Sequence, residues 1–258
     1  MINYIIAVIL GVLLGQVTNH FIRRLPDIIE EDNEFKTLIP TLKKDFKWDY
    51  KYSIILVILN VAITYFVGNT YMSYIYMILV SQLLVVTAID FKMQMIPDTV
   101  QVVVLLLGII VTAIDYTNWL GHLIGMILGI GIFALIAVFS KIVFRKDGMG
   151  MGDIKLMAGL GLIFGIEGIP TSFYDFLAKS DVLLTITVLS FFMAAIVAVI
   201  LLVTNKTDKF QYMAFGPYIV IATICIILFG TAPFLDGYFF VCTKLADVIT
   251  ELMLKFIN

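Results

Sequence analysis

Long apolar runs, separated by short polar segments, are the dominant pattern along the chain. A helix needs roughly 20 apolar residues to cross a bilayer, so each such run is a candidate transmembrane helix. The pattern predicts about eight of them, and therefore an all-α polytopic membrane protein. The expected spans are residues 3–22, 53–68, 71–89, 97–114, 119–140, 154–170, 182–204 and 212–232.

The two ends of the chain give different signals. No positive charge precedes the run from Met1 to Ile22, while Arg23 and Arg24 follow it, so we expect a retained first span and not a cleaved signal. In residues 238–258, charged side chains recur at helical spacing among apolar ones. That spacing fits an amphipathic helix on the membrane surface as well as a ninth span.

The chain is expected to form one membrane domain, because no repeat, Ser/Gly linker or proline-rich segment divides it. Residues 1–22 are the first span, and residues 23–52, the only sizeable hydrophilic segment, are a loop. Residues 53–237 then form the transmembrane core, and residues 238–258 the C-terminal helix.

Composition supports a membrane location. Of the 258 residues, 61% are hydrophobic and 14% are charged, and the mean hydropathy is +1.05. A water-soluble domain of this length is not expected to be so apolar, so membrane lipid is the expected surrounding. The net charge is −2 and the basic residues are scattered through short loops, which argues against nucleic acid as a partner.

Loops on alternate sides of the predicted spans differ in positive charge. One side holds only Lys179. The other side holds Arg23, Arg24, Lys36, Lys43, Lys44, Lys47, Lys51, Lys92, Lys141, Arg145, Lys146, Lys155, Lys206 and Lys209. Because positively charged loops stay in the cytoplasm, the second set is expected to be cytoplasmic, with Met1 outside. Asp90, at the end of the third span, and Asp153, at the start of the sixth, then both lie at the cytoplasmic face.

Asp90 directly follows a long apolar run, where a carboxylate is costly unless it is used or paired. Taken alone, it also fits a helix-end carboxylate that reaches water and pairs with Lys92. Asp98, after Pro97, is expected to have a structural role, because an acid in the first turn of a helix suits the helix dipole.

Asp153 follows three glycines at alternate positions, Gly148, Gly150 and Gly152. These glycines predict unusual backbone freedom where a helix begins, and room for a substrate strand or a second aspartate to approach. The alternative is a flexible connector in which Asp153 only caps the sixth span.

Two carboxyl groups on one side of a membrane suggest hydrolysis by an aspartate dyad. Repulsion splits their titration, so that one is ionised and activates water while the other is protonated and donates to the carbonyl oxygen. Other chemistries find few residues, since the histidines are His20 in the first span and His122, expected in an outer loop. The cysteines, Cys225 and Cys242, lie far apart in apolar stretches without CxxC spacing, so they are expected to pack as small apolar side chains and to bind no metal.

Four ordered segments resemble the type IV prepilin peptidases, a branch of the GxGD intramembrane aspartyl proteases. Gly150-Met151-Gly152-Asp153-Ile154-Lys155-Leu156 is similar to the family's GxGDxKL, and Ile89-Asp90 with Ile96-Pro97-Asp98 to its ID…(L/I)PD block. The segment from Gly11 to Pro26 resembles the family's entry GSFLNVVIYRLP, and Phe215-Gly216-Pro217 its late PFGP.

The resemblance implies a GxGD aspartyl protease core in a multi-pass protein of the bacterial cytoplasmic membrane. It implies that Asp90 and Asp153 are catalytic, with Gly150, Gly152, Lys155, Pro97 and Asp98 in supporting positions. The implied reaction is removal, at the cytoplasmic face, of the short basic leader from type IV prepilins or pseudopilins, which needs no cofactor.

Many members of this family also methylate the new N-terminus with S-adenosylmethionine, and many carry two CxxC pairs in the first loop. This chain lacks those pairs, so zinc is not expected there and methyl transfer is less certain. The candidate methyltransferase residues are Gly15, Asn19 and Arg23, from the entry segment.

Two other functions are compatible with the same residues. A transporter would use the acids at the membrane edge to bind protons or cations, although neither aspartate lies in the middle of a predicted span. A catalytically silent assembly factor for pili would keep its function without either acid.

Overall fold

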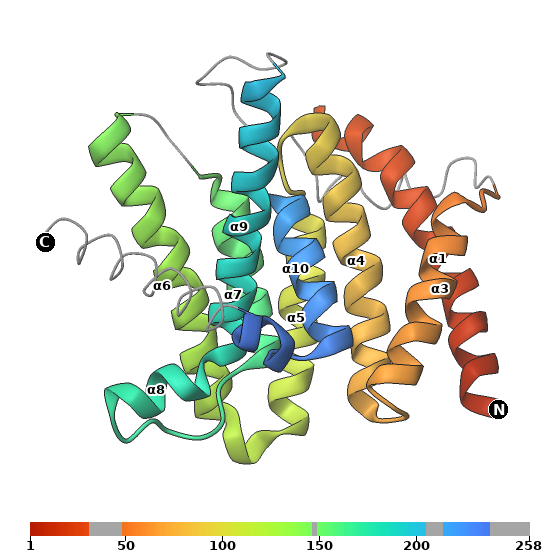
Figure 1. The fold of residues 1–258 in the computed structure, drawn as a ribbon. Coiled ribbons are helices and arrows are strands. Elements are labelled where there is room, and N and C mark those ends of the chain that lie inside the picture. The colour runs from red at the N-terminus through yellow and green to blue at the C-terminus, as the bar shows by residue number, and fades with distance from the viewer. Residues whose placement is uncertain (31–47, 146–148, 205–213, 238–258) are drawn as a thin grey trace, which may run out of the picture.

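The computed structural model describes residues 1–30, 48–145, 149–204 and 214–237, and all regular elements assigned there are helices, which confirms the all-α class. The helices lie side by side in a bundle (Figure 1). The elements are α1 (Ile2–Glu30), α3 (Lys51–Phe66), α4 (Tyr71–Met93), α5 (Asp98–Ile114), the short 3₁₀ helix η1 (Tyr116–Asn118), α6 (Trp119–Phe144), α7 (Met151–Phe164), α8 (Phe173–Lys179), α9 (Asp181–Val203) and α10 (Gly216–Phe229).

The predicted spans correspond to eight of these helices. Four segments are long and apolar enough to cross a membrane, namely Ile2–Pro26, Tyr71–Met93, Tyr116–Val143 and Asp181–Leu201. Lys51–Phe66, Asp98–Ile114 and Gly216–Phe229 are shorter apolar helices. The possible ninth span, residues 238–258, lies outside the described residues.

Several helix ends, and the place of one histidine, differ from the sequence prediction. The helix α1 continues to Glu30, past the predicted end at residue 22. The helix α7 ends at Phe164, before the predicted boundary at residue 170, because Gly165 adopts a positive φ of 60° that an α-helix does not allow. His122 was expected in an outer loop, but it lies buried in the first turns of α6. There its Nδ1 is 2.9 Å from the carbonyl oxygen of Leu162, and this contact ties α6 to α7.

The helix α4 lies in the middle of the bundle and contributes much of the buried core. Its neighbours are α1 and α3 on one side and α5 and α10 on the other (Figure 1). Leu79, Val80, Leu83 and Val86 are fully or almost fully buried. A side chain in the last turn of α4 is therefore held in place from several directions.

Glycines let two pairs of helices approach closely. On α1, a Cβ at Gly11 would lie 2.7 Å from Cα of Val57 on α3. On α6, Gly121, Gly125 and Gly129 face the backbone of α7 and of the residues that follow it, and Gly125 contacts Gly161. Small residues at such contacts allow van der Waals packing between helices that lipid alone does not drive together.

The bundle has two distinct ends, which we call the upper and lower ends as they stand in Figure 1. At the upper end α4 finishes and α7 and α10 begin, so three helix termini meet there. At the lower end lie η1 and α8. The helix α6 leans away from the others toward the upper end, where many of its apolar side chains are exposed.

Candidate active site

Asp90 lies in the last turn of α4 and is only 4% exposed. Its Oδ2 accepts a 2.9 Å hydrogen bond from the backbone N–H of Gly216, the first residue of α10. The start of a helix carries unsatisfied N–H groups and partial positive charge, so this contact stabilises a carboxylate. Asp90 is therefore held by a helix that is distant in sequence.

Gly216 is required by the closeness of this contact. A Cβ at this position would lie 2.7 Å from Oδ2 of Asp90 and 3.4 Å from Cδ1 of Ile96. The preceding Phe215 packs against Phe191 and Phe133, with ring centroids 4.8 and 6.0 Å apart, and these contacts anchor the start of α10. The backbone N–H of Gly216 is thus presented to Asp90 by a packed aromatic cluster.

Asp153 is held by its own segment. It lies in the first turn of α7, is 7% exposed, and its Oδ2 accepts a 3.3 Å hydrogen bond from the backbone N–H of Gly150. Gly150 is the N-cap of α7 and has an extended backbone, with φ of −74° and ψ of 145°. The backbone N–H of Asp153 donates in turn to the backbone oxygen of Gly150 at 3.2 Å, so one local turn orients the carboxyl group and starts the helix.

The two aspartates line the same cavity, which has a volume of about 170 Å³. Its other walls come from Gln94, Met95 and Ile96 before α5, from Asp98 and Gln101 in the first turn of α5, from Gly150, Met151, Gly152 and Lys155, and from Phe215. The carboxyl groups interact electrostatically across it. Two buried carboxyl groups that share a site favour a state with one proton between them, as acid–base hydrolysis requires.

Four of the five predicted supporting residues line this cavity, namely Asp98, Gly150, Gly152 and Lys155. Asp98 is the first residue of α5, with Pro97 as its N-cap in an extended conformation. Lys155 of α7 forms a 2.6 Å ion pair with Oδ1 of Asp98, although the two residues are 57 positions apart. Asp98 is an acid in the first turn of α5, and its ion pair joins the start of α5 to the start of α7; its structural role stays a prediction.

Gly152 lies where α7 approaches the loop before α5. A Cβ there would lie 3.0 Å from Cβ of Ile96 and 3.3 Å from Nε2 of Gln101. Its role in this structure is therefore to let the two segments approach closely beside Asp153.

The sequence-based assignment missed two residues, one that holds Asp90 and one that lines the cavity. Phe215-Gly216-Pro217 was noted as a segment, but nothing in the sequence links Gly216 to Asp90, from which it is 126 positions away. Gln101 lines the cavity and is 6% exposed, and it was not singled out. An uncharged polar residue early in an apolar run was the available signal.

The candidate methyltransferase residues form a separate cluster between α1 and the start of α3. Nδ2 of Asn19 donates a 2.8 Å hydrogen bond to the backbone oxygen of Asp49, and Arg23 forms a 3.5 Å ion pair with the Asp49 side chain. Gly15 contacts Ser53, and Gln16 donates to Oγ of Ser53 at 3.0 Å. These contacts dock α1 on α3 within the described residues, whereas residues 31–47 of the same loop lie outside them, so the role of this cluster in methyl transfer stays a prediction.

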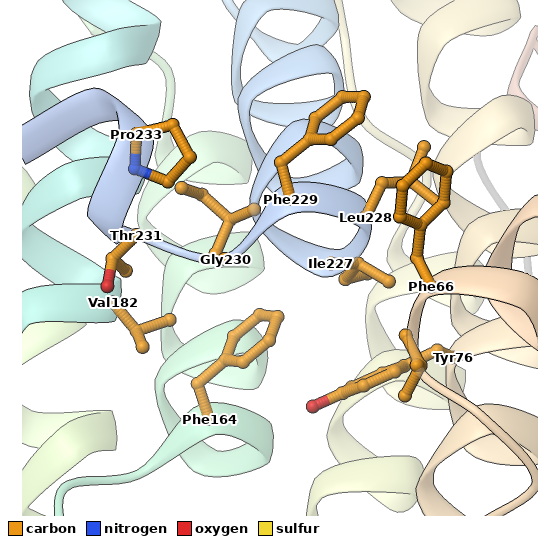
Figure 2. A pocket seen from close by; sticks show the side chains of 12 residues that line it. Phe66, Tyr76, Phe164, Val182, Ile227, Leu228, Phe229, Gly230, Thr231 and Pro233 are labelled. Carbon is orange, nitrogen blue, oxygen red and sulfur yellow. The ribbon is translucent and has the colours of Figure 1, made fainter. Parts of the chain in front are cut away.

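A larger cavity, of about 660 Å³, lies at the lower end of the bundle. Figure 2 shows its mainly apolar walls, which include Phe66, Tyr76, Phe164 and Phe229. Among the residues that the structure describes, no Asp, Glu, Lys, Arg or His lines it. Its size alone does not make it a site of hydrolysis, so the smaller cavity with the two aspartates is the candidate active site.

Metal ligands do not gather in the part of the chain that the structure describes, since no group of three His, Cys, Asp or Glu residues forms there. Cys225, on α10, is a free cysteine and is partly buried, while Cys242 lies outside the described residues. That the protein binds no zinc stays a prediction.

An apolar helical bundle that brings two buried carboxyl groups to one small cavity defines a membrane protein with an aspartate pair. Residues 77–204, which contain both aspartates, match the model of the type IV leader peptidase family.

Curated relatives agree with this assignment. The chain is 32% identical over 151 residues to a protein of Stutzerimonas stutzeri, covering 57% of this chain and 47% of the relative. It is 31% identical over 165 residues to a protein of Pseudomonas aeruginosa, covering 63% and 52%. A Pseudomonas putida protein is 30% identical over 177 residues, covering 67% and 56%. All three are named prepilin leader peptidase/N-methyltransferase.

The matched region spans about half the length of these relatives. No solved structure matches the chain. The family is one of peptidases, so the transporter interpretation receives no support from it.

Proposed function

We propose that the chain is an aspartic endopeptidase of the bacterial cytoplasmic membrane that removes the leader from prepilins or pseudopilins. The observation that carries this proposal is the meeting of Asp90 and Asp153 at one cavity at the upper end of the bundle. The similarity to prepilin leader peptidases supports the choice of substrate. The positive charge of the neighbouring loops supports a cytoplasmic active site, where a basic leader remains.

In this mechanism Asp90 is the ionised member of the pair, because the Gly216 N–H at the start of α10 donates to it at 2.9 Å. Asp153 accepts a longer bond, of 3.3 Å, and carries the shared proton. Asp90 removes a proton from water, and the resulting hydroxide attacks the scissile carbonyl carbon. Asp153 donates its proton to the carbonyl oxygen, giving a neutral tetrahedral intermediate.

Collapse of that intermediate completes the reaction. The carbon–nitrogen bond breaks as the amine takes the proton held by Asp90, and the hydroxyl proton of the intermediate returns to Asp153. The products are the leader with a new carboxyl end and the mature protein with a new amine. The pair returns to its starting protonation state without a metal or a covalent intermediate.

We expect Asp90→Asn and Asp153→Asn each to reduce leader cleavage by at least about a thousandfold, because an amide keeps the shape but cannot exchange the proton. The double variant should be no worse than either single one, since losses within a cooperating unit do not add. Cleavage of a purified prepilin, followed by gel shift and N-terminal sequencing, measures this with equal amounts of folded protein.

Asp98→Asn is the matched control, because it makes the same chemical change beside the cavity in a residue that pairs with Lys155. It should lower cleavage only mildly. Substantial cleavage by either Asn variant of the pair would contradict the mechanism.

Methyl transfer is not part of this proposal. The relatives are named for it, but Gly15 and Asn19 are engaged in docking α1 on α3, so we derive no step through S-adenosylmethionine. Mass spectrometry of the mature N-terminus after co-expression measures whether a methyl group is added.

A further inference from the structure

We propose that Gln101 binds the substrate backbone beside the scissile bond, with its side-chain oxygen accepting a main-chain N–H. This inference rests on the proposed endopeptidase function and adds a substrate-binding residue to it. It starts from an unusual polar side chain at the wall of the cavity that holds Asp90 and Asp153.

Gln101 lies in the first turn of α5 and is 6% exposed, so its side chain has lost almost all contact with solvent. A polar group in such a position is normally hydrogen-bonded on every side, because burial without a partner is costly. In Gln101, the amide nitrogen has a hydrogen-bond partner and the amide oxygen has none among the described residues.

The nitrogen half is satisfied and fixes the orientation of the amide. Nε2 donates a 2.9 Å hydrogen bond to the backbone oxygen of Ile96, and the reverse orientation would bring two oxygens together. Oε1 is consequently the end that is left, and it has no hydrogen-bond partner in the described part of the chain. The amide is held rigidly with a neutral acceptor unused.

Two backbone N–H groups at the cavity already donate to the aspartates. That of Gly216 donates to Asp90, and that of Gly150 donates to Asp153. A peptide held in extended form brings its own N–H groups, each of which needs an acceptor once water is displaced. A neutral acceptor suits this purpose, because it orients the peptide without changing the charge of the aspartate pair.

The test removes the N–H from the substrate and the acceptor from the enzyme. A prepilin-derived peptide is compared with analogues in which one backbone amide near the scissile bond is replaced by an ester, leaving the scissile amide intact. In the wild type, one ester should lower kcat/KM by about tenfold, as expected for one hydrogen bond in a buried site. Gln101→Met should have a kcat/KM about tenfold below that of the wild type on the parent peptide. Replacing the same amide by the ester should then lower the kcat/KM of Gln101→Met little further.

Asn60→Leu is the matched control. Asn60, on α3, is also a buried amide whose oxygen lacks a partner among the described residues, but it does not line the cavity. This variant should show the wild-type response to every ester. A merely structural role of Gln101 would lower the rate on all peptides by the same factor.

The ester series separates the possible failures. The role of Gln101 is overturned if no ester lowers the kcat/KM of the wild type. It is also overturned if each ester lowers the kcat/KM of the wild type and of Gln101→Met by the same factor. The peptidase assignment stands in both cases. The same holds if Gln101→Met is folded by thermal unfolding and cleaves no peptide at all. If the wild type does not cleave the parent peptide, the proposed function and this inference fail together.

Discussion

The two aspartates differ in what holds them in place. Asp153 is oriented within one turn by Gly150, whereas Asp90 depends on Gly216, which belongs to another helix. The position of Asp153 is therefore a local property of its segment, and that of Asp90 is a property of the packed bundle. Substitutions at the two supporting glycines should have different effects for this reason.

We expect Gly216→Ala to reduce cleavage by roughly tenfold to a hundredfold. The added Cβ would lie 2.7 Å from Oδ2 of Asp90, so either the carboxyl group or the start of α10 must move. A hydrogen bond to a charged group is worth about 1.5–3 kcal/mol, which corresponds to this loss if the bond is weakened in the transition state. Cleavage of a purified prepilin by equal amounts of folded protein gives the comparison.

Gly131→Ala provides the control for this experiment. A Cβ at Gly131, on α6, would meet no atom within 4 Å, so cleavage should be unchanged. If Gly216→Ala were as active as Gly131→Ala, the contact between Gly216 and Asp90 would not matter for hydrolysis.

Asp90 and Asp153 could be found from sequence because a charge at the edge of an apolar run is conspicuous whatever the fold. The partner of Asp90 could not be found in this way, since Gly216 acts through its backbone and has no side chain to signal a role. The unused oxygen of Gln101 likewise depends on where Ile96 and its neighbours lie in space.

The contact between α6 and α7 is the clearest case of helix packing that depends on glycines. Gly125 on α6 meets the backbone of Gly161 on α7, so the two main chains approach without a side chain between them. Since α7 carries Asp153 in its first turn, this contact also helps to set the position of Asp153 along the axis of the bundle.

Gly125→Leu should lower the stability of the folded protein by about 1–3 kcal/mol or more, because the added side chain overpacks a backbone contact that cannot relax easily. Thermal unfolding in detergent should show a decrease of several degrees in Tm. Gly131→Leu, on the exposed part of the same helix, should leave Tm close to that of the wild type. Equal decreases for both variants would argue against close packing at Gly125.

Element positions could be predicted better than element ends. The apolar runs gave α4 and α6 starting at residues 71 and 119, as observed, because polar turn residues precede each run. The end of α7 was misplaced because residues 165–170 are apolar enough to continue a span, and apolar character alone does not reveal a backbone turn. The short α8 was not predicted, since seven residues give too little periodicity to detect.

At the scale of the whole molecule, the candidate active site and the larger apolar cavity lie toward opposite ends of the bundle. The aspartate pair lies where α4 ends and α7 begins, toward the upper end, and the larger apolar cavity lies where α3, α7 and α10 end, toward the lower end (Figure 1). The prediction that the upper end faces the cytoplasm rests on the distribution of Lys and Arg and is open to direct test.

Cysteine labelling of intact cells tests this orientation after Cys225 and Cys242 are replaced by alanine. A cysteine at exposed Arg145, at the upper end of α6, should not react with an impermeant thiol reagent, whereas one at exposed Tyr174, on α8, should react. Permeabilised cells provide the control, in which both positions should be labelled. Labelling of position 145 but not 174 in intact cells would place the active site outside.

The hydrogen bond from Gly216 to Asp90 also sets an order on the synthesis of the protein. A chain that has been made only as far as α9 already contains both carboxyl groups, but it lacks the N–H that holds one of them. The site is complete only after α10 has entered the membrane and packed against α4. On the proposed function, a nascent chain would therefore become fully active only late in its synthesis, once most of the bundle has been made.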